Sequence, residues 1–279
     1  MTVTKKKIHS NFLMISNYNN NISWIPEYTD NYIIYDQSAA AIYPPKLDRT
    51  KVIQSAHLGH NIRDYCSFII DHYENLPEVT IFATGNVFPR HVSRDAFDSI
   101  VNEQQFTPIK DTPRYRVSLP DSFIDDNDMY NEANKNWYIN ENHPTKYFHT
   151  YNDFLKFCFR EPNLPVFITF VPGANYVVPK EHIKMYPRVF YENLRTFVSH
   201  CSTAIPGESH IIERALYSIW RERLTLTKEM QKPVNDATFP FITRTKTPLY
   251  VAILHKVMLK FTRLQSRLLR ANDDYQNKS

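Results

Sequence analysis

The chain has 279 residues, of which 42% are hydrophobic and 14% aromatic, and it carries 33 basic against 29 acidic side chains. This length and apolar content allow one large or two small folded domains with a sizeable core, and they exclude a disordered chain. The net charge of +4 is mild and the charges are interspersed, so no nucleic-acid partner is expected, because nucleic-acid surfaces carry a concentrated basic stripe.

The three cysteines show no spacing typical of a zinc site or a redox pair. Cys66 and Cys158 stand in apolar runs and are expected in the core. The N-terminal segment MTVTKKKIHS is not followed by an apolar stretch, and no run of about 18 apolar residues occurs. The sequence therefore predicts neither a signal peptide nor a transmembrane helix, and it favours a cytoplasmic protein.

The first predicted elements are those of a parallel α/β sheet. We expect a strand over 12–19, a short helix over 23–29 with Ser23 as its N-cap, and a strand over 31–38. Ligands of such sheets collect at the carboxyl ends of the strands. The residues expected to share that rim are Ser16, Asn17, Tyr18 and Asp36.

An amphipathic helix follows an irregular stretch that begins at Pro44. Its apolar positions recur at helical spacing from Ile62 to Tyr73. The loop before it contains Gly59 and leads into the helix N-terminus, where free N–H groups suit a phosphate, although capping alone explains the same residues. The run EVTIFATGN, residues 78–86, then reads as a buried strand that ends in a turn.

Residues 88–150 are polar and rich in Asn and Asp, and they give no clear elements. Their acidic cluster, residues 125–128, could ligate a hard cation through oxygens. The glycine and glutamate of a calcium loop are missing at the required offsets, so a solvated loop is the simpler interpretation.

The C-terminal half predicts two further strands and three helices. Residues 163–179 read as strand, Pro-Gly turn and strand, and helices are expected over 187–198 and 208–220. The last of these carries His210, Glu213, Tyr217 and Trp220 on one face, which is either part of a site or a solvated surface. From Pro248 to Arg270 a long helix with one apolar and one basic stripe is expected, docked on the domain rather than on an anionic membrane.

Several residues between 57 and 86 form a recognisable pattern: Gly59, Tyr65, Ile69, Tyr73, Leu76, Pro77, Thr80 and Phe82. This pattern resembles the signature N-x-G-x-E-x-x-x-Y-L-x-x-I-x-x-x-Y-x-x-L-P-D-x-T-x-F of an uncharacterised, glycosyltransferase-like family. The segments around 18–38, 170–194 and 211–220 are similar to other parts of that family, so the resemblance covers about half the chain. His57 and Asn61 stand where the family has Asn and Glu, which puts the donor chemistry in doubt.

The resemblance implies one GT-A-like, Rossmann-type α/β domain with a mixed central sheet flanked by helices. A donor half would span about 1–100, an acceptor half about 101–247, and a basic amphipathic helix 248–279. The implied activity is glycosyl transfer from a UDP-sugar, with UDP-xylose suggested by likeness to algal-virus glycosyltransferases of this size. The implied partner is a glycan acceptor, either an oligosaccharide or a glycoprotein.

The same resemblance assigns residues to each part of the site. The donor-binding set is Ser16, Asn17, Tyr18, Asp36, His57, Arg63, Thr84, Gly85 and Asn86. The acceptor-binding set is Pro172, Gly173, Asn175, Tyr217 and Trp220.

An inverting transfer needs a base on the acceptor side and positive charge at the departing diphosphate. Glu213 is the first candidate base, with His210 one turn away, and Glu208 is the second. For the diphosphate two alternatives stay open, a metal or protein cations. A Mn²⁺ or Mg²⁺ ion would be held by Asn86, His91 and Asp128. Without a metal, the candidates are Arg63, Arg90, His91, Arg244 and Lys246, and these residues fit slightly better.

Two other functional classes are compatible with the sequence. One is a catalytically inactive sugar- or nucleotide-binding module on the same fold. The other is a peripheral-membrane interaction protein that works through the basic stripe of 248–270.

Overall fold

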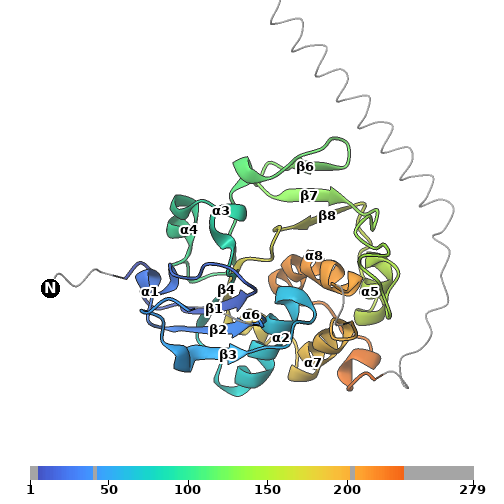
Figure 1. Ribbon diagram of the computed structural model, residues 1–279. Coiled ribbons are helices and arrows are strands. Elements are labelled where there is room, and N and C mark those ends of the chain that lie inside the picture. Colours follow the sequence, from blue (N-terminus) through green and yellow to red (C-terminus); the bar gives the residue numbers. More distant parts are fainter. Residues whose placement is uncertain (1–5, 40–42, 202–204, 236–279) are drawn as a thin grey trace, which may run out of the picture.

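The computed structural model of the protein describes residues 6–39, 43–201 and 205–235. They form a mixed six-stranded sheet flanked by helices, together with a small three-stranded antiparallel sheet (Figure 1). The large sheet contains β1 (Phe12–Asn17), β2 (Tyr32–Asp36), β3 (Val52–Gln54), β4 (Val79–Thr84), β5 (Thr107–Pro108) and β9 (Tyr176–Pro179). The small sheet contains β6 (Ser122–Ile124), β7 (Tyr130–Ala133) and β8 (Phe167–Phe170).

Eight α-helices and four 3₁₀ turns connect the described strands. The helices are α1 (Ile25–Tyr28), α2 (His60–His72), α3 (Val87–Arg90), α4 (Arg94–Ile100), α5 (Tyr151–Cys158), α6 (Lys180–Ile183), α7 (Arg188–Phe197) and α8 (Gly207–Arg221). The 3₁₀ turns are η1 (Arg49–Lys51), η2 (Tyr73–Asn75), η3 (Thr112–Arg114) and η4 (Glu229–Gln231).

The strand order of the large sheet is β3-β2-β1-β4-β9-β5. The first four strands are parallel, and β9 runs antiparallel to both β4 and β5. The chain therefore builds outward from β1 through β2 to β3 and then returns to place β4 on the other side of β1. Such a reversal is a topological switch point, and ligands of α/β sheets bind in the crevice outside the carboxyl ends of the strands at that point.

The large sheet separates two hydrophobic cores, as the alternation of side chains along β1 shows. Leu13 and Ile15 pack into a core with residues of α1 and α4, whereas Met14 packs into the larger core with residues of α2, α7 and α8. Neighbouring residues of a strand point to opposite faces, so both faces of this sheet are covered by helices. The buried positions of Cys66 and Cys158 in the larger core confirm the sequence expectation.

The small sheet is attached to α8 by a buried ion pair. Arg214 Nε lies 2.8 Å from Glu132 Oε1, and Arg214 Nη2 lies 3.3 Å from Glu132 Oε2. Figure 1 shows α8 between the small sheet and α2, and α8 contacts both. This pair matters for the site because Arg214 also faces Glu213.

The strands and helices expected within the described residues are present, but several elements were not expected: α3, α4, β5, β6 and β7 in or next to residues 88–150, and the helices α5 and α6. The edge strand β3 was not expected, because three residues are too few to show an alternating pattern. The expected N-cap at Ser23 is wrong: the cap position is Trp24, and the Ser23 N–H is instead bound by the side chain of Asn21. The acidic cluster at 125–128 forms the turn between β6 and β7, in which the carboxylate of Asp125 accepts three hydrogen bonds.

In the described part of the chain no helix is long and apolar enough to cross a membrane. The expected helix of 248–279 lies outside the described residues, as do Arg244 and Lys246.

Trp220 gives a test of the core. Its side chain is fully buried, stacks on Phe82 with ring centroids 5.0 Å apart, and meets the edge of Tyr176. We expect Trp220→Ala to lower the free energy of unfolding by about 3–5 kcal/mol, because it leaves a large cavity. Urea denaturation measures this effect, and Trp220→Phe should cost less.

Trp137, whose side chain is 63% exposed, is the matched control. We expect Trp137→Ala to change the unfolding free energy by no more than about 0.5 kcal/mol. Equal losses in the two alanine variants would contradict the core position of Trp220.

Candidate functional site

The carboxyl ends of β1 and β2 are fixed by the fully buried carboxylate of Asp36. Its Oδ1 accepts hydrogen bonds from Asn17 Nδ2 at 3.2 Å and from the N–H and hydroxyl of Ser38. Its Oδ2 accepts from the hydroxyl of Tyr43 at 2.6 Å. Burial and then this carboxylate raise the pKa of Tyr43 to about 12. Asp36 therefore holds the rim together, and Asn17 Oδ1 is left without a partner among the described residues.

A second buried carboxylate, Asp64 at the start of α2, lies behind the same rim. It accepts hydrogen bonds from Ser16 Oγ at 2.6 Å, from Gln37 Nε2 at 2.8 Å and from Ser55 Oγ at 2.5 Å. Burial raises the pKa of Asp64 to about 6, against the lowering effect of these donors and of Arg63. The sequence interpretation missed Asp64, because an acid between the apolar positions of an amphipathic helix is normally on its solvated face.

Unpaired polar atoms occur around the carboxyl ends of β1 and β4 and just before β9. The Thr84 N–H donates to Asn175 Oδ1 at 3.0 Å. Thr84 Oγ1 and Asn175 Nδ2 are buried and have no partner in the described ranges, like Asn17 Oδ1. A Cβ on Gly85 would fall 2.2 Å from Asn17 Oδ1, so this position needs a glycine. Buried polar groups are seldom left unpaired, so three of them at a sheet switch point indicate a place for a polar ligand.

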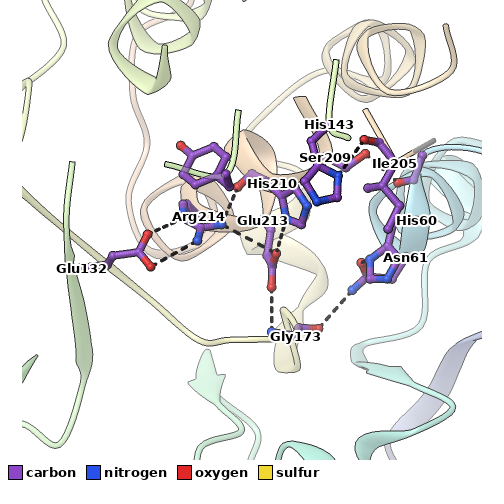
Figure 2. Close-up of polar contacts among 12 residues, drawn as sticks. His60, Asn61, Glu132, His143, Gly173, Ile205, Ser209, His210, Glu213 and Arg214 are labelled. Atoms are coloured by element: carbon purple, nitrogen blue, oxygen red, sulfur yellow. Dashed lines mark hydrogen bonds and ion pairs between the residues drawn. The ribbon is translucent and has the colours of Figure 1, made fainter. Parts of the chain in front are cut away.

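The backbone of Gly173 lies two residues before Asn175, and both its N–H and its carbonyl are hydrogen-bonded. Its N–H donates to Glu213 Oε1 at 2.7 Å, and its carbonyl accepts from Asn61 Nδ2 at 3.0 Å (Figure 2). Gly173 has φ +87, and a Cβ there would meet the His91 ring at 2.6–2.8 Å. The glycine is thus required by its backbone angle and by the imidazole packed against it.

The carboxylate of Glu213 stays ionised. Burial alone would raise its pKa, but His210, Arg214 and the N–H of Gly173 outweigh burial and hold the pKa at about 2. His210 Nδ1 lies 3.6 Å from Glu213 Oε2, and the Arg214 guanidinium lies 4.0 Å from the same oxygen. Figure 2 shows His210, Arg214 and Gly173 converging on this carboxylate.

Two more imidazoles flank Glu213 and are held neutral. Burial, followed by the charge of Arg90, lowers the pKa of His91 to about 4. Burial by the surrounding protein is also the largest cause that lowers the pKa of His60, against the raising effect of Glu213. His60 Nδ1 lies 2.7 Å from Asn61 Oδ1. The site therefore combines one fixed anion with two imidazoles that stay neutral near pH 7.

The other predicted donor residues lie around this centre. Tyr18 and His57 stack on each other at the exposed rim, with ring centroids 4.2 Å apart and planes 7° apart. Arg63 donates to Ser55 Oγ, and its Nε is buried without a partner in the part of the chain described. The roles of these residues stay predictions.

Three residues predicted for the site are not brought into it. Glu208 is fully buried; Oε1 accepts from the N–H groups of 146–148, and Oε2 lies 2.9 Å from His200. Trp220 is in the core, out of reach of an acceptor. Tyr217 is half-buried beside Phe106 and Arg221.

The residues proposed as metal ligands do not fit a Mn²⁺ or Mg²⁺ ion. Asp128 is exposed in the turn between β6 and β7, whereas His91 packs against Gly173. Across the described ranges, no three His, Cys, Asp or Glu side chains are arranged to hold a metal.

Two surface hollows lie apart from Glu213. One of about 700 Å³ is lined by Lys146, Arg195 and His200 among others, and one of about 450 Å³ by Trp24, Phe88 and Arg94 among others. Both are lined by several polar and charged side chains, but none of those described lining residues has an unpaired buried side-chain atom. We place the candidate site at the switch point, because unpaired buried atoms are a more specific sign of a ligand than volume.

The comparison with known families gave one match. The model of a family described as protein of unknown function (DUF3431) matches residues 13–236, which include the whole switch point and Glu213. No curated protein and no solved structure matched the chain.

The contact between Gly173 and His91 gives the first prediction for the site. We expect Gly173→Ala to lower the free energy of unfolding by about 2 kcal/mol or more, from the strained φ and the clash. His91→Ala should remove the clash, so the double variant should lose less than the sum of the single losses. Additivity within about 0.5 kcal/mol, measured by urea denaturation, would show that His91 does not occupy this position.

The lowered pKa of His91 gives a pH dependence. The folded state keeps His91 neutral down to about pH 4, whereas the unfolded chain protonates it near its ordinary pKa of about 6.5. Its contribution to stability is therefore full above about pH 6.5 and is lost as the pH falls toward 4. We expect the stability of the wild type relative to His91→Ala to decline from pH 7 to 4.5. A constant difference in urea unfolding across this range would contradict it.

Proposed function

The chain belongs to the DUF3431 family, and we propose that this member is a glycosyltransferase that moves a sugar from a UDP-sugar to a glycan acceptor. The observation that carries the proposal is the set of unpaired buried atoms around the switch point, from Asn17 on one face of the sheet, Thr84 on the other and Asn175 just before β9, near the ionised Glu213. A polar ligand at this edge of the sheet would satisfy those atoms and would lie close to a carboxylate. The same proposal includes that the α/β domain is a GT-A-like glycosyltransferase domain.

The donor would lie along the carboxyl ends of β1 and β4. The stacked pair of Tyr18 and His57 offers an aromatic surface on which the nucleobase can pack. The polar atoms of Asn17 and Thr84 would bind the nucleoside sugar and the first phosphate. Arg90, whose charge acts on both His60 and His91, supports binding of the diphosphate.

The transfer step needs a group that accepts a proton. The acceptor hydroxyl oxygen bonds to the anomeric carbon while the bond from that carbon to the diphosphate oxygen breaks, and the electron pair leaves with UDP. The hydroxyl proton passes to the Glu213–His210 pair. Attack from the face opposite the diphosphate inverts the anomeric centre.

The Glu213–His210 pair is a better candidate for the general base than Glu213 alone. A carboxylate with a pKa of about 2 is always ionised but is a weak base. His210 Nδ1 faces this carboxylate, and its Nε2 is buried without a partner within the described ranges. We propose that Nε2 accepts the proton and that Glu213 stabilises the imidazolium, as a carboxylate does in other acid–base pairs.

The resulting prediction concerns Glu213→Gln. We expect it to lower the rate of UDP release from a UDP-sugar in the presence of oligosaccharide acceptors by about 10²–10⁴-fold. Binding of UDP, measured as a shift in melting temperature, should be retained, because Glu213 is on the acceptor side. The shift should persist in EDTA, since the described residues offer no metal site.

Glu222→Gln is the matched control, because Glu222 is exposed at the end of the same helix. It should leave both measurements unchanged. An unchanged rate in Glu213→Gln would contradict the assignment of the base. A protein whose melting temperature is not shifted by UDP, GDP, CDP or ADP would contradict the transferase, and UDP binding without any turnover would indicate an inactive nucleotide-binding module.

A further inference from the structure

Trp137 is the most exposed of the large hydrophobic side chains that the structure describes, at 63%. It lies in the loop between β7 and α5, residues 134–150, to which the sequence assigned no role. An exposed tryptophan of this kind is common enough on its own. The residues around Trp137 indicate more specifically that it contacts a ligand.

The loop holds Trp137 in place. Asn136 Oδ1 accepts the N–H of Tyr151 at 2.7 Å, and the Ile139 N–H donates to the carbonyl of Asn136 at 3.0 Å. Asn134 Nδ2 donates to Asn152 Oδ1 at 2.9 Å and to the Pro165 carbonyl at 3.0 Å. The indole is thus presented by an ordered loop, and binding to it would cost little conformational entropy.

One guanidinium connects Trp137 to the candidate base. The Arg214 guanidinium carbon lies 5.7 Å from the centroid of the Trp137 ring, and the guanidinium lies 4.0 Å from Glu213 Oε2. Arg214 is already paired with Glu132. The cation under the indole is therefore neutralised by protein carboxylates, so this surface suits a neutral ligand better than an anion.

Two buried, unpaired polar atoms belong to side chains that neighbour the indole and the base. Tyr138 is 2% exposed and its hydroxyl has no partner among the described residues; the same holds for His210 Nε2. The Tyr138 ring lies 5.9 Å from that of Trp137 and 5.8 Å from that of His210, between centroids. A hydroxyl-bearing ligand on Trp137 would find a donor and an acceptor in the direction of Glu213.

We propose that Trp137, Tyr138 and His210 form the acceptor subsite, and that its occupant is a neutral pyranose ring of a glycan. The C–H face of the ring packs on the electron-rich face of the indole. A ring hydroxyl reaches the Tyr138 hydroxyl and His210 Nε2, next to Glu213. The inference rests on the proposed glycosyl transfer and names its acceptor class.

Tryptophan fluorescence tests the subsite directly. The chain has three tryptophans, and Trp24 and Trp220 are only 4% and 0% exposed, so quenching by iodide reports on Trp137. The probes are neutral trisaccharides of xylose, glucose, mannose and galactose, each with and without UDP. We expect at least one of them to protect Trp137 from iodide.

Variants then identify the role of the ring. For the trisaccharide that protects, Trp137→Ala should raise the acceptor KM or Kd about tenfold, with kcat and the UDP-induced melting shift unchanged. Trp137→Phe should restore most of the affinity, which a merely structural role would not explain. Leu164→Ala, at another exposed hydrophobic position, is the control and should change nothing.

The outcomes separate the two proposals. Lack of protection by every trisaccharide, in a protein that binds UDP, overturns the acceptor subsite and leaves the transferase standing. Protection by a trisaccharide in a protein that binds no nucleotide supports the sugar subsite and contradicts the transferase. Protection by UDP alone would place the nucleotide on Trp137 and overturn the subsite.

Discussion

The backbone of Gly173 is the constraint on which the candidate site depends. It lies in the segment that leads from β8 of the small sheet to β9 of the large one, and its left-handed backbone makes that turn. Its N–H fixes Glu213 on α8, its carbonyl binds Asn61 on α2, and its missing side chain leaves room for His91. Because one residue joins all of these, the position of the carboxylate relative to the sheet is set by the fold itself. A movement of either sheet would shift the base.

The charged groups around Glu213 fix the positions of side chains more than they stabilise the fold. Arg214 and Glu132 are both buried, and such a pair gains little net free energy because two charges must be desolvated. What the pair provides is a guanidinium at a fixed place between Glu132, Glu213 and the indole of Trp137. The same charge helps to keep Glu213 ionised. The carboxylate is therefore suited to holding a protonated imidazole, which agrees with a role shared with His210.

The sequence predicted which residues end the strands, but it did not predict which side chains are enclosed by segments distant in sequence. Alternation and polar termini placed Asn17, Asp36 and Thr84 at one edge, because parallel strands expose their carboxyl ends together. Helical spacing put Glu213 and Trp220 on one face of α8, but it could not show that the far end of that face is enclosed by Phe82 and Tyr176. Local pattern likewise gave no sign of Trp137, because its significance comes from Arg214, distant in sequence. Asp64 was missed for the same reason: its partners Ser16, Gln37 and Ser55 come from separate segments.

The end of β4 carries Thr84 and Gly85 where a metal-dependent enzyme would need acids, and the surrounding histidines suggest what replaces them. His91 is neutral because burial and Arg90 disfavour its charged form. A diphosphate placed near Arg90 would reverse that balance, because an anion favours the protonated imidazole. On the proposed function, binding of the donor would then draw a proton onto His91 or His60. The diphosphate leaving group would then face a protonated imidazole as soon as the donor is bound. Without the donor, the site would not have to hold several cations close together.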